Sequence, residues 1–378
     1  MTRDAFVAGY VRTPFTFARK GPLAAARPDD LGAHVVRALL ERTGVPAGEI
    51  EDVVWGSAFP EGEQGLNIGR MVGLLAGLPH AVSGMTVNRW CGSSIQSVQA
   101  AAGMLAMGAG DAFIAGGCES MSRVPMMGFN PAPNPGFGRE LTGDILAQGP
   151  TAERVAERYG IDREAQDRFA LDSHRKAHAA QAAGRLDAEI APFPAGDATV
   201  ARDGCIRETS MDKLRDLRAA FVENGSVTAG NSSPMTDGAS ALLVCTAEFA
   251  KRHGLEPLAR IESFAVAGCD PAIMGMGPVA ASQKAMARAG VTIADIDYVE
   301  MNEAFASQAE ACRRELAIPE EKLNVDGGAI ALGHPLGGTG GRLVGKGASL
   351  LRRDGARRAL ATQCIGGGMG IAMVLEAA

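Results

Sequence analysis

Hydrophobic and polar positions alternate in blocks along the first 120 residues, and the same succession returns after about residue 257. Short runs rich in β-branched and aromatic residues alternate with longer runs whose apolar residues recur every three or four positions, which is typical of strands followed by helices. The pattern predicts strands at 6–10, 52–58, 85–90, 112–115, 259–266, 298–301, 323–325 and 358–362. It predicts helices at 29–43, 65–76, 93–107, 279–289, 304–316 and 340–352.

Both blocks end in a strand that leads into glycines. Residues 113–118 close the first block and 361–368 close the second, and each strand follows a helix of small residues. We interpret the recurrence as an internal repeat of α/β units, so that two doubly wound halves pack on each other. Strand-to-helix loops of both halves would then converge on one crevice, which is where open α/β sheets bind ligands.

The segment between the blocks has a different character. Prolines are frequent between 125 and 135, and 151–184 is a densely charged helical run. We interpret this segment as an inserted lid rather than a third core domain. The expected organisation is an N-terminal half made of 1–118 and 223–255, an inserted loop domain at 119–222, and a C-terminal half at 256–378.

Composition narrows the class of protein. Hydrophobic residues make up 46% of the 378, enough for a large core, while 49 glycines and only 5% aromatic residues indicate closely packed backbone. The net charge of −6 without a basic block argues against nucleic-acid or membrane-surface partners. No apolar run approaches the roughly 18 residues of a membrane span, and no export signal is recognised, so we expect a cytoplasmic protein. Seven scattered cysteines without a Cys-x-x-Cys pair predict free thiols and no metal site.

Among the six histidines, His334 has the most unusual surroundings. It lies in a segment, 327–340, that is dense in glycine, so backbone can approach a ligand closely there. His174 and His178 have the spacing of a metal pair but no third ligand nearby, and we expect them on a solvated helix face. His334 is therefore the candidate acid or base.

Cys91 is the candidate nucleophile. It stands at the end of a predicted strand and the start of a helix, where the helix dipole is expected to lower a thiol pKa. Cys364 follows the last predicted strand and precedes a glycine run whose N–H groups could hold an oxyanion. Asn302 ends a strand and could orient a water. Asp237, before Gly238, is expected to form a turn rather than to act as an acid.

Five segments resemble the motifs of the thiolases, in matching order over essentially the whole chain. They are Asn88-Arg-Trp-Cys-Gly-Ser-Ser94, Gly230-Asn-Ser-Ser-Pro-Met-Thr-Asp-Gly-Ala239, Met301-Asn-Glu-Ala-Phe305, Gly327-Gly-Ala-Ile-Ala-Leu-Gly-His-Pro335 and Cys364-Ile-Gly-Gly-Gly-Met-Gly370. The resemblance implies two similar halves stacked in five layers, αβαβα, with a loop domain inserted in the first half. It also implies CoA-dependent cleavage of 3-ketoacyl-CoA to acetyl-CoA and a shortened acyl-CoA, or the reverse Claisen condensation.

The same resemblance assigns roles to residues. It makes Cys91 the acylated nucleophile, His334 its activating base, and Cys364 the acid/base at the α-carbon of acetyl-CoA. One oxyanion site would consist of His334 and a water held by Asn302, and the other of the N–H groups of Cys91 and Gly366. CoA is then a co-substrate, and no metal or permanently bound cofactor is required.

For CoA, the resemblance places Arg218 near the adenine, Ser233 near the pantetheine and Met274 in the wall of the acyl pocket. Ala219 stands where the family usually has proline. Residues 147–148 are Ala-Gln, where short-chain members commonly carry His-Met. This difference favours a degradative enzyme of fatty-acid β-oxidation over an acetoacetyl-CoA-forming acetyltransferase.

Other interpretations stay open. A decarboxylating ketoacyl synthase of the same fold would carry histidine or asparagine where this chain has its second cysteine. A catalytically silent acyl-CoA or lipid binder is disfavoured because Cys91, His334 and Cys364 are all present. The resemblance also implies a homodimer or homotetramer, and it allows a partner subunit of fatty-acid oxidation.

Overall fold

The computed structural model describes residues 4–378, and its strands repeat one order in two halves. In the first half the order is β4-β3-β5-β8-β1, and in the second it is β10-β11-β12-β9. The strands are paired in the same way in both halves. The first half has two parallel pairs followed by two antiparallel pairs, and the second half has one parallel pair followed by two antiparallel pairs. The bounds are β1 Phe6–Arg12, β3 Asp52–Gly56, β4 Ser83–Val87, β5 Ala112–Ser120, β8 Thr236–Cys245, β9 Ala259–Gly268, β10 Tyr298–Met301, β11 Arg358–Ile365 and β12 Met369–Glu376. The predicted internal repeat is confirmed.

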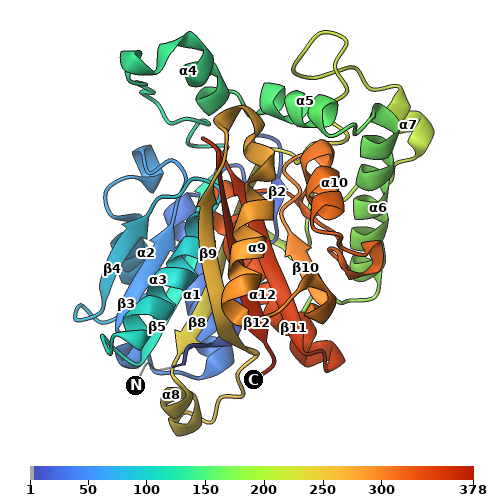
Figure 1. Ribbon diagram of the computed structural model, residues 1–378. Coiled ribbons are helices and arrows are strands. Elements are labelled where there is room, and N and C mark those ends of the chain that lie inside the picture. The colour runs from blue at the N-terminus through green and yellow to red at the C-terminus, as the bar shows by residue number, and fades with distance from the viewer. Residues whose placement is uncertain (1–3) are drawn as a thin grey trace.

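Helices cover both sheets and fill the space between them, giving the five predicted layers (Figure 1). Helices α1 (Pro28–Thr43) and α2 (Ile68–Leu75) pack on the first sheet, and α9 (Gly277–Ala289) covers the second, with α10 (Ala306–Glu315) beside it. Between the sheets lie α3 (Ser93–Ala106) and α12 (Leu336–Asp354). The sheets meet at one edge through a two-residue β1–β9 ladder, and β2 (Thr16–Phe17) adds to β8.

Glycines allow the central helices to approach each other and the sheets. A Cβ at Gly340 of α12 would lie 2.5 Å from the backbone nitrogen of Ile95 in α3, and a Cβ at Gly345 would overlap the ring of Tyr10. Such distances are far below van der Waals contact. Part of the glycine excess is therefore explained by packing in the middle layer.

The chain leaves the first sheet at Ser120 and returns to it at Thr236. The intervening elements are α4 (Gly138–Leu146), α5 (Gln148–Arg158), α6 (Arg163–Ala182), β6 (Phe193–Ala195), β7 (Ala198–Val200) and α7 (Met211–Arg215). Helices α4, α5 and α7 lie at the end of the sheets opposite the chain termini, and α6 runs along the flank beside α10 (Figure 1). The predicted first half starts at residue 1, and its first three residues lie outside the described range.

Several local predictions are wrong. Residues 323–325 are not a strand: Leu323 forms only an isolated bridge with Val299, and Asn324 has a positive φ of 44° that interrupts extended backbone. Asp237 is not in a turn, because strand β8 already includes it, and its buried carboxylate accepts hydrogen bonds from Ser122. Strands β8 and β12 were missed, and α12 begins four residues before the predicted position.

The remaining short elements connect these units. They are α8 (Ala247–Arg252), α11 (Ala329–Leu332) and 3₁₀ turns at Ala47–Glu49, Gly62–Gln64, Pro135–Phe137, Pro271–Met276, Ile293–Asp295 and Glu320–Lys322. Within residues 4–378, no helix combines the length and apolar character needed to cross a membrane.

Candidate active site

Cys91 lies in the loop that joins β4 to α3, and the second half of the molecule holds this loop in place. Its carbonyl oxygen accepts a 2.7 Å hydrogen bond from Gln363 Nε2 in β11. The backbone N–H groups of Gly366 and of Cys91 itself favour the thiolate and act to lower the pKa of the thiol. Trp90, the residue before it, has a positive φ of 44°, which turns the chain sharply into the helix. Cys91 of the first half therefore lies against the last strands of the second half.

The pKa of Cys91 is raised to about 11, which contradicts the lowering predicted from the helix start. Burial of the thiolate is the main cause, and the nearby carboxylate of Glu119 adds to it, while the N–H of Gly366 opposes it only in part. Cys91 is therefore a neutral thiol at neutral pH. It needs a base to become a nucleophile.

His334 can supply that base. It is buried, its backbone N–H donates to Thr236 Oγ1 at 3.0 Å, and its ring Nδ1 lies 2.6 Å from Thr339 Oγ1. Its Nε2 lies 3.3 Å from Asn302 Nδ2. A proton on Nδ1 that is donated to Thr339 leaves Nε2 as the acceptor. Burial, with a smaller effect from the positive Arg342, lowers the pKa of His334 to about 3, so the ring is neutral.

Thr339 was missed in the sequence. It lies five residues after His334 in the first turn of α12, among glycines, and helix-start threonines usually bond backbone. Only the structure shows that its hydroxyl meets the imidazole.

Asn302 follows β10, and its backbone N–H donates to the carbonyl of Thr362 in the neighbouring β11 at 3.0 Å. The side chain is fully buried, and among the described residues Oδ1 has no hydrogen-bond partner. The amide is therefore free to hold a small polar group beside the imidazole of His334.

Cys364, near the end of β11, is buried and packs in one cluster with Met274 and Phe305. Burial raises the pKa of its thiol well above the usual value, and the neighbouring Cys91 raises it further. Cys364 is thus a protonated thiol that can donate. The loop after it turns at Gly367 and Gly368, which have positive φ angles of 77° and 80°.

Gly366 brings the loop after Cys364 close to the segment that contains Cys91. A Cβ at this position would lie 2.8 Å from the Trp90 ring, closer than side chains tolerate. The absence of a side chain lets the backbone of Gly366 pack against Trp90, the residue that precedes Cys91. Cys91, His334, Asn302, Cys364 and Gly366 are thus connected through these loops.

The three residues expected to contact CoA have different surroundings. Arg218 is exposed at a cleft of about 550 Å³ that is lined by 218–225. Ser233 donates through both N and Oγ to the carbonyl of Ala304, at 3.0 and 3.1 Å, in the loop that carries Asn302. Met274 is buried in the cluster that contains Cys364.

The two histidines with metal-like spacing differ from each other. The side chain of His178 is 57% exposed, as predicted, but His174 is buried, and its Nδ1 accepts the backbone N–H of Arg207 at 3.3 Å. Burial lowers the pKa of His174 to about 4. Across residues 4–378, no group of three or more His, Cys, Asp or Glu side chains is arranged to hold a metal ion.

Comparison with known proteins assigns the class. Residues 5–248 match the family description "Thiolase, N-terminal domain", and residues 255–377 match "Thiolase, C-terminal domain". The chain belongs to the thiolase family. It is 46% identical to the 3-ketoacyl-CoA thiolases of Bacillus subtilis (strain 168) and of Aeromonas salmonicida (strain A449), over 99% of this chain and 99% of each relative.

The fold agrees with this membership. The human mitochondrial 3-ketoacyl-CoA thiolase, solved in complex with CoA, superposes with a TM-score of 0.92 and 36% sequence identity. The match covers 100% of this chain and 98% of that one. The predicted α/β fold class is confirmed.

Proposed function

We propose that the protein is an acyltransferase that cleaves 3-ketoacyl-CoA with CoA to acetyl-CoA and a shortened acyl-CoA, through an acyl group on Cys91. The full-length relatives named 3-ketoacyl-CoA thiolase and the human structure with CoA support this activity and CoA as co-substrate. The observation that carries the mechanism is the 2.7 Å hydrogen bond from Gln363 Nε2 to the carbonyl oxygen of Cys91, because it holds the loop of Cys91 against the strand that carries Cys364.

In the first half-reaction, neutral His334 takes the proton of Cys91, and the thiolate attacks the 3-keto carbon. The bond between C2 and C3 breaks, and its electron pair passes to the thioester oxygen as an enolate. Cys364 then gives its proton to C2, which releases acetyl-CoA and leaves the acyl group on Cys91. Loss of one oxyanion donor typically costs about 3–4 kcal/mol, so donors to these oxygens carry much of the catalysis.

In the second half-reaction, the thiol of CoA loses its proton to the Cys364 thiolate and attacks the acyl carbon. The tetrahedral oxyanion is stabilised by the N–H groups of Cys91 and Gly366, and Cys91 leaves as a thiolate. His334 returns the proton to Cys91. Protons and electron pairs balance without a metal or a redox partner.

We assign Arg218 to the adenine end of CoA, Ser233 to the pantetheine, and Met274 to the acyl pocket. Ser233 is hydrogen-bonded to Ala304 in the loop that carries Asn302, and this position supports its assignment. Arg218, being exposed beside a cleft, can reach a bound nucleotide.

The second candidate is an acetoacetyl-CoA-forming acetyltransferase. Gln148, in place of the methionine expected for that class, has its Nε2 3.4 Å from where a Cβ on Gly366 would lie, so it borders the site. A series of 3-ketoacyl-CoA substrates of increasing length separates the two. A degradative enzyme retains kcat/KM for chains longer than acetoacetyl-CoA, whereas activity confined to acetoacetyl-CoA contradicts our proposal.

We further propose a cytoplasmic homodimer or homotetramer. The side chains of Leu66 and Met107 are 89% and 87% exposed, and they lie next to the helices that pack beside the edge strand β4. Single exposed apolar side chains are common on protein surfaces, so the support comes from the edge strand itself, whose outer N–H and C=O groups can pair with a second copy of the chain. Light scattering on the purified protein measures the assembly, and a monomeric mass contradicts the proposal.

A further inference from the structure

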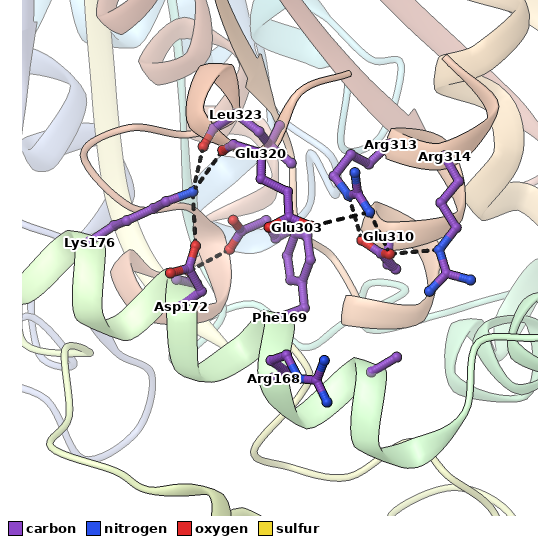
Figure 2. Close-up of a pocket in the computed structure, with 12 residues that line it drawn as sticks. Arg168, Phe169, Asp172, Lys176, Glu303, Glu310, Arg313, Arg314, Glu320 and Leu323 are labelled. Carbon is purple, nitrogen blue, oxygen red and sulfur yellow. Dashed lines mark hydrogen bonds and ion pairs between the residues drawn. The ribbon is translucent and has the colours of Figure 1, made fainter. Parts of the chain in front are cut away.

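A cleft of about 380 Å³ lies between α6 of the inserted segment and α10 of the second half (Figure 2). The charged side chains on its walls neutralise one another: Lys176 pairs with Asp172 at 2.9 Å, and Glu310 pairs with Arg313 at 2.7 Å. Glu303 also lines the cleft but is buried, and within residues 4–378 it forms no ion pair. Its carboxylate is held by neutral donors instead.

Those donors come from three separate segments. Glu303 Oε2 accepts from Ser173 Oγ at 2.6 Å, in α6, and from the backbone N–H of Ile330 at 3.1 Å, in α11. Its Oε1 accepts from Asn324 Nδ2 at 2.7 Å. Ile330 lies four residues before His334, and Glu303 itself directly follows Asn302. The buried carboxylate of Glu303 thus links the segment of Asn302 to the segment of His334, and these two side chains lie 3.3 Å apart, from Nδ2 to Nε2.

Asn324 extends the link to the strand that precedes Asn302. Its Oδ1 accepts from the N–H of Met301 and its Nδ2 donates to the carbonyl of Met301, both at 2.9 Å. At Gly328 a Cβ would overlap the carboxyl group of Glu303, so glycine is required for the carboxylate to reach its donors. The N–H of Gly328 donates to Ser173 Oγ at 3.3 Å, which closes the network.

We propose that Glu303 is a positioning residue that fixes the separation of Asn302 and His334, and that Ser173 makes this geometry depend on the docking of α6. The proposal rests on the function given above. Misplacement of a catalytic group by about 1 Å can cost on the order of a hundredfold in rate, so a hydrogen-bond anchor one residue away controls turnover without touching substrate.

Glu303→Gln tests the idea, because it keeps the shape but replaces one accepting oxygen by an NH₂ group. We expect kcat to fall about tenfold while KM for both substrates stays within about twofold, since the CoA-binding surface is unchanged. Glu310→Gln is the matched control: it also removes a carboxylate from the cleft, but one whose hydrogen-bond partners among residues 4–378 are Arg313 and Arg314. Its kcat should match that of the wild type.

A double substitution separates positioning from general damage. In an Asn302→Ala background, Glu303→Gln should change kcat less than about twofold, because its target is already gone. The proposal would be overturned by a further tenfold loss of kcat in the double variant. It would also be overturned if Glu303→Gln alone had the kcat of the wild type, or if it raised KM without lowering kcat.

If Glu303→Gln does not fold, Ser173→Ala decides the matter, since it removes a single donor from α6. We expect about a threefold lower kcat with unchanged KM and an unchanged circular dichroism spectrum. A wild-type kcat for Ser173→Ala would then contradict the proposal. Lack of thiolysis by the wild-type protein itself would instead refute the proposed function.

Discussion

The contact between Thr339 and His334 makes the sharpest prediction about the base. Thr339→Val keeps the side-chain volume but removes the oxygen that lies 2.6 Å from His334 Nδ1. The buried Nδ1–H then has no acceptor, and the tautomer with its proton on Nε2 becomes competitive. That tautomer cannot take the proton of Cys91.

The size of the effect follows from the burial of the pair. Thr339 is fully buried and His334 is 4% exposed, so water does not replace the lost oxygen. An unsatisfied buried donor costs about 1–3 kcal/mol. At about 1.4 kcal/mol for each factor of ten, kcat should fall roughly tenfold to a hundredfold. KM should change little, because neither residue is among those assigned to CoA.

Steady-state thiolysis of acetoacetyl-CoA, followed by loss of the substrate absorbance, measures both constants. Thr246→Val is the control: this buried threonine caps α8, near the chain termini and far from the inserted helices, by accepting the N–H of Phe249 (Figure 1). It should lose some stability but no activity. A kcat for Thr339→Val within about threefold of the wild type would refute the role assigned to this contact.

The other predictions concern the reacting groups. Cys91→Ser should abolish acyl transfer with the fold intact, and thiolysis above about a tenth of the wild-type rate would contradict the assignment. Cys364→Ala should still be acylated on Cys91 but should lose deuterium exchange at the methyl group of acetyl-CoA, and unchanged exchange would exclude its acid/base role. The pKa of His334 is lowered to about 3 in the folded protein, whereas an unfolded histidine titrates near pH 6.5. Between about pH 6.5 and pH 3, therefore, the unfolded chain binds a proton at this histidine that the folded protein does not bind. Relative to His334→Asn, the wild type should therefore lose unfolding free energy as pH falls from about 6.5 towards 3, and a difference independent of pH would contradict the neutral ring.

Much of the fold could be predicted because the apolar pattern is local. The α/β alternation and the small-residue helices before the two glycine loops indicated the repeat, and the structure confirms it. The antiparallel strands β8 and β12 could not be found this way, because each follows a loop rather than a helix of the repeating pattern. The position of Asp237 depends on the pairing of β8 with β5, because Asp237 lies opposite Ser120, more than a hundred residues earlier in the chain.

In the candidate site, too, local sequence predicts some features and long-range contacts decide the others. Strand ends and glycine loops pointed to Cys91, His334 and Cys364, since these positions follow from the local pattern. The pKa of Cys91 was predicted in the wrong direction, because desolvation depends on what the fold places around the sulfur. Thr339 and Glu303 act through partners that only the folded chain brings within hydrogen-bond distance.

Passage of an acyl group through Cys91 is tested most directly by the mass of the protein and of its Cys91 peptide after incubation with acetyl-CoA. We predict one acetyl group on the Cys91 peptide, removed when free CoA is added and absent from Cys91→Ser. An unmodified Cys91 in a protein that still binds CoA, or an acetyl group on another residue, would contradict it.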